Sequence, residues 1–442
     1  MDTASQKGLA GWNDHRITRR QCSQMLLTVG MLGAGLGSML SACTQQPANL
    51  YWHSEDDENH SFQYLSRKFN ETHPDIQIQQ MRLSPGSPYN PHDDVMNHIK
   101  SDQYRPDVIS LDVVWMKEFA TNGWLEPLDR YWQPIQDRAN YLPNALQAVN
   151  FDGHIWAAPL HTDVGVLFYR TDIVKTAPTT WDELKSLSLE ATRSGKAAYG
   201  YVWQGIKTEA LMCNFVEVLS SFGGHLFDPH DPKKVTIYHP EAVQALQTMI
   251  DWIHGPQAIS PLQVLGYDES GSNTTWNNGK AVFMRNWPSH IFWSNDAQQS
   301  KIAEQFNVTA LPAGSTSTRA CLGGWQLGIN AFSPHKDDAW TFIKWMLEKD
   351  AQQYLAVKET FPVTLKDIYN DQYIDDFNPF FKKIPDILRT AQNRPQLVNY
   401  PQVANAIQQY VYLAIQQPKI YPADMALKLL QGQLEQIMHQ SK

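Results

Sequence analysis

The chain has 442 residues, more than one hydrophobic core usually supports, so we expect two domains. Its 42% hydrophobic and 18% charged residues are typical of an ordinary globular protein. A formal net charge of −9, without any basic stripe, argues against a nucleic-acid-binding protein. The 15 Trp residues favour a binding surface, because a buried indole needs a partner for its N–H.

The first 42 residues are expected to be an export signal rather than part of the fold. A basic leader precedes an apolar, Gly-rich run at residues 25–40, which is too short and too interrupted to span a membrane. The run ends in LSAC, and polar residues follow at once. This pattern resembles a bacterial lipoprotein signal, with lipid on Cys43; an ordinary secretory peptide is the alternative. Arg19 and Arg20 leave the export route open, Sec or twin-arginine.

Lipid on Cys43 would be the main attachment to the membrane, because so acidic a chain should not lie flat on an anionic bilayer. Cys213 and Cys321 remain after cleavage and can pair in an oxidising compartment. Their surroundings are typical of a buried helix and a buried strand, which favours two separate core thiols. A metal site at His53 and His60 is conceivable, but their spacing matches no standard pattern. We therefore expect no metal and no cofactor.

The mature chain opens with an apolar stretch at residues 50–53, a helix with its apolar period at residues 62–69 and a strand at residues 75–81. Glu58 lies in an acidic run before the helix, where carboxylates favour the helix dipole. A strand at residues 108–111 and a helix at residues 114–121 follow.

Asp112 and Trp115 follow the carboxyl end of that strand. In an open α/β sheet, ligands bind outside the carboxyl ends of the strands. Both residues are therefore candidates for a binding site. Asp112 can also cap the helix, and the two roles can coexist.

Residues 151–170, FDGHIWAAPLHTDVGVLFYR, place one carboxylate between two apolar segments. Pro159 is expected to end a strand at residues 155–158, because it fixes φ and lacks an N–H. A buried strand is predicted at residues 164–169. Asp163 either caps the turn between them or faces a cleft between two lobes.

Several elements follow in chain order. Thr180 caps a helix, and Glu183 completes a capping box. The remaining predictions are strands at residues 199–203, 279–287 and 308–312, and helices at residues 212–222, 241–253, 336–349 and 403–415.

Two glycines precede a tryptophan in LGGWQLGI. Gly323 and Gly324 allow backbone N–H groups to approach a ligand closely beside the flat face of Trp325. A glycine bulge in a core strand is the alternative interpretation.

Several motifs, in order over nearly the whole mature chain, resemble the extracellular solute-binding proteins of sugar ABC transporters. They are PDVISLDVVWMKEFATNGWLEPLD, GHIWAAPLHTDVGVLFYR, PTTWDEL, YVWQG, AVFMRNWP, ACLGGWQLGI and RPQLVNYPQ, and they look closest to the trehalose/maltose-binding branch. The resemblance implies an α/β, two-lobed periplasmic-binding-protein fold with three hinge crossings, near residues 159–164, 309–312 and 361–366. One lobe would comprise residues 43–160 and 312–363, and the other residues 161–311 and 364–442.

The resemblance also implies which residues contact the sugar. These are Glu58, Asp112, Asp163, Trp287, Gly323, Gly324, Trp325 and Arg394, with weaker assignments for Trp115, His161, Tyr169 and Trp203. Carboxylates and Arg suit sugar hydroxyls, and aromatic rings suit sugar C–H faces. His161 stands where the relatives carry Tyr, Cys321 replaces a small hydroxyl residue, and the loop at residues 83–93 departs from their pattern. These departures affect which sugar is bound.

The leading hypothesis is a non-enzymatic, monomeric receptor that is tethered by lipid in the periplasm or at the cell surface. It would deliver trehalose, maltose, sucrose or a compatible solute such as glucosylglycerol to ABC permease subunits in the inner membrane. A secreted glycoside hydrolase using Glu58, Asp112 and Asp163 is the second hypothesis. A partner of a chemoreceptor is the third.

Overall fold

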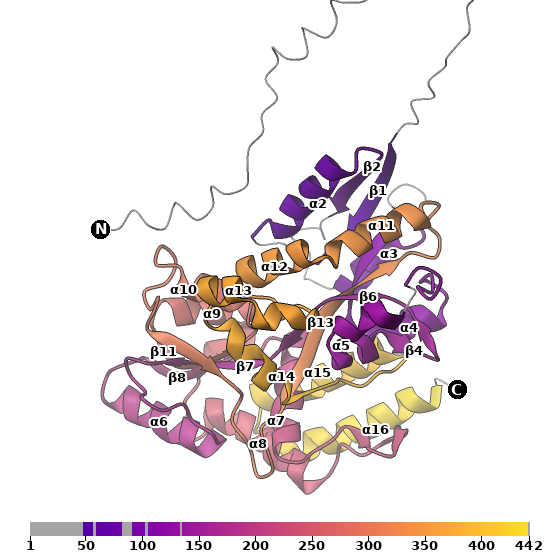
Figure 1. Cartoon of the computed structure of the whole chain (residues 1–442). Coiled ribbons are helices and arrows are strands. Elements are labelled where there is room, and N and C mark those ends of the chain that lie inside the picture. The colour runs from indigo at the N-terminus through magenta and orange to yellow at the C-terminus, as the bar shows by residue number, and fades with distance from the viewer. Residues whose placement is uncertain (1–46, 56–58, 82–90, 102–104, 133–134, 441–442) are drawn as a thin grey trace, which may run out of the picture. The chain divides into compact units, whose positions relative to one another are not determined.

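The computed structural model describes residues 47–440, apart from 56–58, 82–90, 102–104 and 133–134. The predicted export signal, Cys43 and Glu58 therefore lie outside the described residues. Within this part of the chain, no helix is long and apolar enough to cross a membrane. The described residues build two main β-sheets with helices packed around them (Figure 1).

The first sheet has six strands, in the order β14-β13-β3-β1-β2, and β6 also pairs with β13. Strand β1 is parallel to β2 and β3, whereas β13 is antiparallel to β3 and β6. The first four residues of β3, VISL, are all buried and three of them are apolar, as expected for a strand covered on both faces. The strands are β1 (Ala48–His53), β2 (Ile76–Met81), β3 (Val108–Asp112), β6 (Ala158–Val164), β13 (Ala320–Ile329) and β14 (Ala391–Gln392).

Aromatic side chains join this sheet to its helices. Trp52 of β1 packs against Phe62 with ring centroids 5.0 Å apart, and against Phe342 at 5.2 Å. Its indole N–H donates to Ser110 Oγ at 3.0 Å, so its burial leaves no donor unpaired. The helices of this layer are α2 (Ser61–Thr72), α3 (Pro91–His98), α11 (Lys336–Met346) and α12 (Lys349–Lys358) (Figure 1).

The second sheet has four strands in the order β12-β7-β11-β8. Strand β7 is antiparallel to β11 and β12, and β11 is parallel to β8. The strands are β7 (Val166–Arg170), β8 (Tyr199–Val202), β11 (Ala281–Asn286) and β12 (Phe306–Thr309), and the helices are α6 (Trp181–Arg193), α7 (Glu209–Ser221), α8 (Pro240–His254), α9 (Glu269–Asn277), α15 (Tyr400–Gln416) and α16 (Ala423–Gln440). The predicted α/β class is confirmed.

Shorter elements connect these layers. The helices are α4 (Met116–Thr121), α5 (Pro143–Ala148), α10 (His290–Asn295), α13 (Gln372–Phe377) and α14 (Ile384–Leu388). The 3₁₀ turns are η1 (Val113–Trp115), η2 (Ile135–Asn140), η3 (Leu262–Gly266), η4 (Lys366–Asn370) and η5 (Phe381–Lys383), and the strands are β4 (Asn150–Phe151), β5 (His154–Ile155), β9 (Phe227–Asp228) and β10 (Asp231–Val235).

The prediction that Pro159 ends a strand is wrong. Pro159 lies inside β6, where the ladder tolerates its missing N–H because the register with β13 shifts there. Trp325 pairs with His161, and the next residue, Gln326, pairs with Pro159. The Pro159 carbonyl accepts a hydrogen bond from Thr364 Oγ1 at 2.7 Å.

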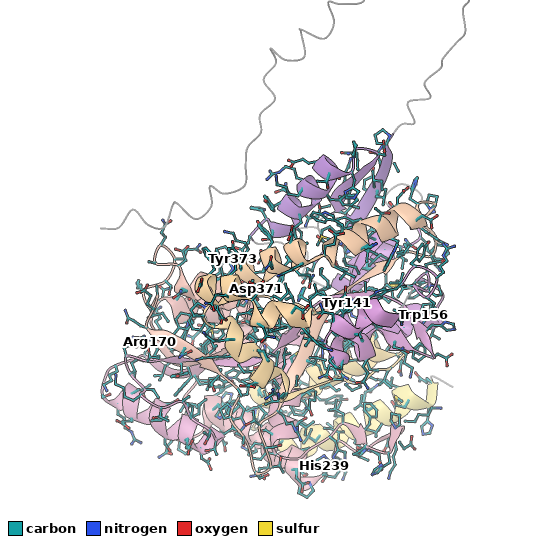
Figure 2. The ribbon with its side chains drawn as sticks, in the orientation of Figure 1. Tyr141, Trp156, Arg170, His239, Asp371 and Tyr373 are labelled. Atoms are coloured by element: carbon teal, nitrogen blue, oxygen red, sulfur yellow. The ribbon has the colours of Figure 1, made fainter. Side chains whose placement is uncertain are left out.

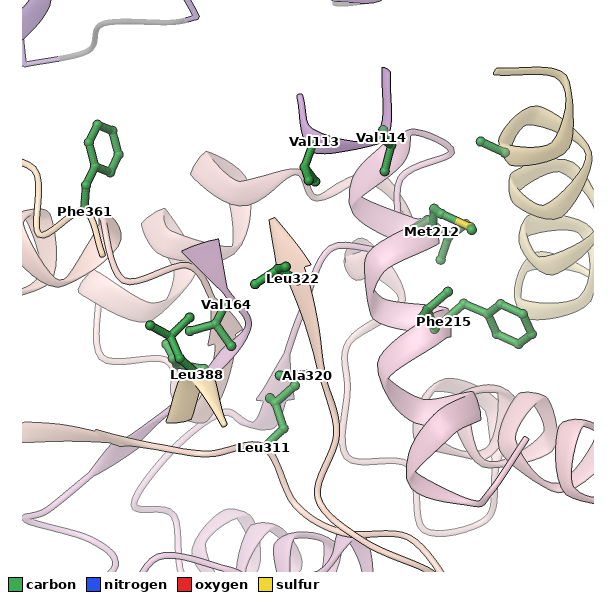
Figure 3. Packing of buried hydrophobic residues seen from close by; sticks show 14 of the residues in the cluster. Val113, Val114, Val164, Met212, Phe215, Leu311, Ala320, Leu322, Phe361 and Leu388 are labelled. Carbon is green, nitrogen blue, oxygen red and sulfur yellow. The ribbon is translucent and has the colours of Figure 1, made fainter. Parts of the chain in front are cut away.

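The buried strand predicted at residues 164–169 is divided at Gly165. Residues before it belong to the first sheet and residues after it to the second, so the chain passes between the sheets at this glycine. A Cβ atom at Gly165 would overlap Glu217 Oε1, which explains why no side chain fits. Figure 3 shows the apolar packing at this passage, with Val164 beside Leu322, its partner in the ladder.

The chain returns to the first sheet between β12 and β13. The third predicted crossing, at residues 361–366, lies beside the first, at residues 159–164. Thr162 N–H donates to the Pro362 carbonyl at 2.9 Å, and His161 forms an isolated antiparallel β-bridge with Val363. The use of these segments as hinges, and the predicted boundaries of the lobes, stay predictions.

Several predicted helices differ from the observed ones at their ends; α15, for example, begins three residues earlier than predicted. The helix predicted at residues 114–121 begins as the 3₁₀ turn η1, α7 begins three residues earlier than predicted, and residues 336–349 divide between α11 and α12. Thr180 caps α6 as predicted, because its hydroxyl accepts from Glu183 N–H at 3.2 Å. The Glu183 carboxylate accepts from the N–H of Thr179, one residue before the position that a capping box uses.

Candidate functional site

A cavity of about 280 Å³ is lined by residues from the layers of both sheets. Seven of the eight residues assigned to the sugar line this cavity, and so does His161; the eighth, Glu58, lies outside the described residues. Sequence reasoning missed other lining residues, of which the most polar or aromatic are Glu55, Asn59, Glu209, Glu269, His290, Trp293, Glu359 and Phe361. The cavity therefore brings together carboxylates and aromatic rings from distant parts of the chain.

Arg394 joins carboxylates from the two layers. Its guanidinium donates to Asp112 Oδ1 at 2.8 Å, at the end of β3, and to Glu209 Oε1 at 2.6 Å, at the start of α7. Burial opposes the charge of Arg394, but the attraction of Asp112 prevails and holds the pKa of Arg394 well above its usual range. Burial raises the pKa of Glu209, and Arg394 counters that rise.

Asp112 caps a turn, as one of its two predicted roles required, and it also lines the cavity. Its Oδ1 accepts from Val114 N–H at 3.2 Å, which caps the turn η1, while the same carboxylate faces Arg394 at the cavity. Glu209 also accepts a hydrogen bond from the Tyr400 hydroxyl and another from Gln408 Nε2, at 3.2 Å. The ion pairs of Arg394 are thus held by partners outside the cavity.

His161 and Asp163 lie two residues apart in β6, and both line the cavity. His161 Nε2 lies 2.8 Å from Glu55 Oε1, and the His161 ring stacks on Phe361 with centroids 3.9 Å apart and planes 2° apart. Burial lowers the pKa of His161, but Glu55 more than compensates, so the net shift is upward. The His161 imidazole is therefore fixed by a carboxylate.

Burial raises the pKa of Asp163 to about 7. Its Oδ1 accepts from the N–H of the next residue, Val164, at 2.9 Å, and its side chain remains partly accessible at the cavity. Asp163 lies inside β6, opposite Gly323 of β13, rather than in a turn, so its position agrees with the interpretation that it faces a cleft.

Trp287, directly after β11, and Trp325, in β13, supply flat surfaces to the cavity. The Trp287 indole lies under the guanidinium of Arg285, 4.0 Å from the ring centroid, and its N–H donates to Glu269 Oε1 at 3.1 Å. Arg285 is itself fixed by Glu217, at 2.9 Å from Nε to Oε2. These contacts hold one ring face and the ring edge of Trp287.

Trp115 supports Trp325 rather than lining the cavity. The two rings meet edge to face, with centroids 5.6 Å apart and planes at 90°. Trp115 is buried, whereas Trp325 is partly exposed.

The glycines before Trp325 are explained by close approach inside the protein. Gly324 has φ 122°, and a Cβ there would lie 2.5 Å from the His161 carbonyl oxygen. A Cβ on Gly323 would lie 3.2 Å from Asp163 Cβ and 3.4 Å from the Trp287 ring. The glycines therefore bring β6 and Trp287 against β13, next to a register shift, as the bulge interpretation predicted.

The weaker assignments Tyr169 and Trp203 do not line the cavity. Trp203 is fully buried in the core of the second sheet's layer, where its N–H donates to Ser260 Oγ at 3.2 Å. Tyr169 lies in β7, opposite Phe283 of β11. The next residue, Arg170, is labelled in Figure 2. Aromatic content alone does not distinguish such core positions from the cavity.

Cys213 and Cys321 are both buried and not joined in a disulfide. A hydrogen bond with Cys321, together with burial, raises the pKa of the Cys213 thiol well above its usual range. The prediction of two core thiols that are not paired in a disulfide is confirmed, and α7 and β13 bring the two thiols close together.

The comparisons with known proteins all lead to one family. The sequence profile described as "Bacterial extracellular solute-binding protein" matches residues 53–353. A probable ABC transporter-binding protein of Deinococcus radiodurans is 35% identical over 345 residues, which cover 75% of this chain and 80% of that protein. The maltotriose-binding protein of Pyrococcus abyssi is 24% identical over 396 residues, covering 87% of this chain and 81% of that one.

A solved structure supports the same assignment of the fold. Maltose-bound MalE3 of T. maritima has a TM-score of 0.81 and 33% identity to this chain, and the match covers 88% of this chain and 100% of that one. The α/β fold is therefore that of the maltose-binding-protein-like periplasmic binding proteins, with which two lobes are consistent. The branch predicted from the motifs stays a prediction.

Proposed function

Because this chain belongs to the bacterial extracellular solute-binding proteins, the ligand-capturing components of ABC transporters, we propose that its solute is a small glucoside or disaccharide. The family binds small solutes outside the cell membrane for delivery to a permease, and its members are not enzymes. Trehalose, maltose, sucrose and glucosylglycerol are the candidates. The relative from T. maritima was solved with maltose.

One observation carries this proposal: carboxylates and tryptophan rings line the same cavity. Sugar hydroxyls donate to carboxylates such as Asp163 and Glu269, while the apolar C–H face of a pyranose packs on an indole such as Trp287. His290 adds a further polar contact, because its Nδ1 is buried without a hydrogen-bond partner among the described residues. Burial lowers the pKa of His290 to about 4, so its imidazole stays neutral.

The charge of the cavity suits a neutral, hydroxyl-rich ligand. Arg394 compensates Asp112 and Glu209, and His161 compensates Glu55, before any solute binds. A solute that supplies hydroxyl donors would then complete the hydrogen bonds of these carboxylates without adding charge. A sugar lacking one of those hydroxyls would leave a buried carboxylate oxygen unsatisfied, which costs affinity.

Since the first sheet and the helices and loop beside the second sheet both line the cavity, a bound sugar would contact both layers and favour the conformation in which they are closest. We propose that the permease recognises this closed conformation. We further propose that lipid on Cys43 tethers the monomeric receptor to the membrane, in the periplasm or at the cell surface. Mass spectrometry of the N-terminal peptide tests the lipid.

Isothermal titration calorimetry with the chain from residue 44 onward tests the proposed ligand class. Trehalose, maltose, sucrose and glucosylglycerol would be titrated separately, with ribitol and a neutral amino acid as controls. We expect one-to-one binding of at least one glucoside, and a higher melting temperature in its presence. Binding of only the control solutes would refute the glucoside proposal.

The alternative of a glycoside hydrolase makes a different prediction for the same samples. A hydrolase would release monosaccharide from labelled trehalose, maltose or sucrose, whereas a receptor would return the sugar intact after denaturation. Turnover would refute the receptor proposal. Loss of sugar uptake on deletion of the chain would argue for transport over chemoreception.

A further inference from the structure

A second group of polar residues lies in the first sheet's layer, outside the residues that line the cavity. His53 ends β1, and Asp94 and His98 lie one turn apart on α3. Each residue offers one metal-ligating atom, and the three atoms all lie within 4.8 Å of one another. We propose that His53, Asp94 and His98 form a binding site for Zn²⁺ or a chemically similar divalent transition-metal ion.

The carboxylate of Asp94 already lies close to both imidazole rings. His53 Nε2 lies 3.1 Å from Asp94 Oδ2, and His98 Nδ1 lies 3.5 Å from Asp94 Oδ1. Donors bound to a tetrahedral zinc ion at 2.0–2.1 Å are separated by about 3.4 Å. The Asp94 carboxylate is therefore close to zinc-binding distance from His53 Nε2, and small rotamer changes, including a rotation that turns Nε2 of His98 to the ion, would bring the three groups around one ion.

His98 is arranged as metal-ligating histidines usually are. Its Nδ1 lies 2.8 Å from the Asp94 carbonyl oxygen, which favours the tautomer with hydrogen on Nδ1. Nε2 then carries a free lone pair for a metal. The i, i+4 spacing on α3 places Asp94 and His98 on one helix face.

His53 supplies an independent observation. It is 2% exposed, and its Nδ1 has no hydrogen-bond partner among the described residues. A buried imidazole is usually fully paired, so an unsatisfied nitrogen indicates a missing partner. A metal ion would bind one nitrogen of the His53 ring. A water molecule, or a small rotation of the ring, would then provide a hydrogen bond for the other nitrogen.

The types and burial of the ligands decide which ion fits. Two imidazoles and one carboxylate suit zinc and its neighbours, whereas calcium and magnesium prefer sites made only of oxygen. The side chains of Asp94 and His98 are 23% and 31% exposed, so water can reach the ion and occupy a fourth position. The sequence offered His53 and His60 as the pair, but the fold brings His53 to His98.

A metal here would fasten α3 to the end of β1. That end lies two residues before Glu55, which lines the cavity and contacts His161. The ion would thus stabilise the first sheet's layer beside the binding site without touching the solute. This inference does not depend on the proposed sugar specificity.

The test uses the untagged chain from residue 44 onward, stripped with EDTA and dialysed. Calorimetry with ZnCl₂ is expected to show one equivalent bound, and Co²⁺ to give the absorption bands of a four-coordinate site. His98→Ala and Asp94→Asn, both at partly exposed positions, should each weaken zinc binding about tenfold or more. His230→Ala, which removes an exposed histidine elsewhere, should bind zinc like the unmodified chain.

Circular dichroism melts without zinc establish that each variant is folded. Absence of zinc binding by the unmodified chain would overturn the proposal. So would unchanged affinity in His98→Ala, or equal weakening in His230→Ala. Sugar binding by metal-free protein does not bear on the metal site, so failure of either proposal is recognised separately.

Discussion

The pKa of Asp163, about 7 in the folded protein, predicts a specific dependence of stability on pH. A carboxyl group with a raised pKa holds its proton in the folded state at pH values where the unfolded chain has lost it. Stability is therefore greatest below the unfolded pKa near 3.8 and falls as pH rises through 7. Asp163→Asn cannot ionise and should remove this loss.

The magnitude follows from linkage. A shift from 3.8 to about 7 makes the folded state about 2–3 kcal/mol less stable at pH 8 than at pH 5. Because Asp163 is partly accessible at the cavity, water reduces this penalty, and we expect about 1–3 kcal/mol. Urea unfolding of both proteins, without ligand, at pH 5 and pH 8 measures the difference.

The informative quantity is the pH-dependent change in the unmodified chain minus that in Asp163→Asn, because other titrating groups largely cancel. An equal pH dependence in the two proteins would refute the burial of an ionisable Asp163. In the same series, Asp163→Asn should weaken sugar binding by about 1–3 kcal/mol at pH 8, where the carboxylate would accept a hydroxyl hydrogen bond. Unchanged affinity would remove Asp163 from the sugar site.

Three further predictions follow from the cavity and the core around it. Trp325→Ala should abolish measurable sugar binding in calorimetry while lowering the melting temperature by only a few degrees, and an unchanged dissociation constant would remove this indole from the site. Arg394→Met should lower the free energy of unfolding by about 3–5 kcal/mol, because Asp112 and Glu209 lose their buried counter-ion. In urea titrations, adding Glu209→Gln should recover part of the lost stability. Full stability of the single variant would contradict the ion-pair network. Neither Cys213 nor Cys321 should react rapidly with a thiol reagent in the folded chain from residue 44 onward, whereas two thiols should react in guanidinium; a fast native reaction would contradict their burial.

The sheets and helices were predictable where local sequence determines them. The apolar run of β3 and the Thr180 cap of α6 are determined by neighbouring residues. Pro159 was misplaced because its tolerance depends on a register shift against β13, about 165 residues later in the chain. The division of the buried strand at Gly165 likewise depends on the Glu217–Arg285 pair lying beneath it.

Some of the cavity residues could likewise be predicted from the sequence, and others could not. Asp112, Asp163 and Trp287 were found because motifs of the family mark them. Glu209 and Glu269 were missed, since a carboxylate in the first turn of a helix is usually explained by the helix dipole. Only the fold shows that Arg394 and Trp287 are their partners.

The balance between these groups would allow an acidic cavity to bind the neutral solute that we propose. Each cavity carboxylate with a described partner already has a donor: Arg394 for Asp112 and Glu209, and the Trp287 N–H for Glu269. A carboxylate has about four acceptor sites. Asp112 and Glu209 each accept three hydrogen bonds and Glu269 accepts one from the described residues, so Glu269 has the most capacity left for sugar hydroxyls. The internal partners reduce the cost of keeping the charges buried, and the unused acceptor sites confer selectivity. A substitution that removes an internal donor should therefore destabilise the ligand-free protein, whereas one that removes a cavity carboxylate should mainly weaken binding.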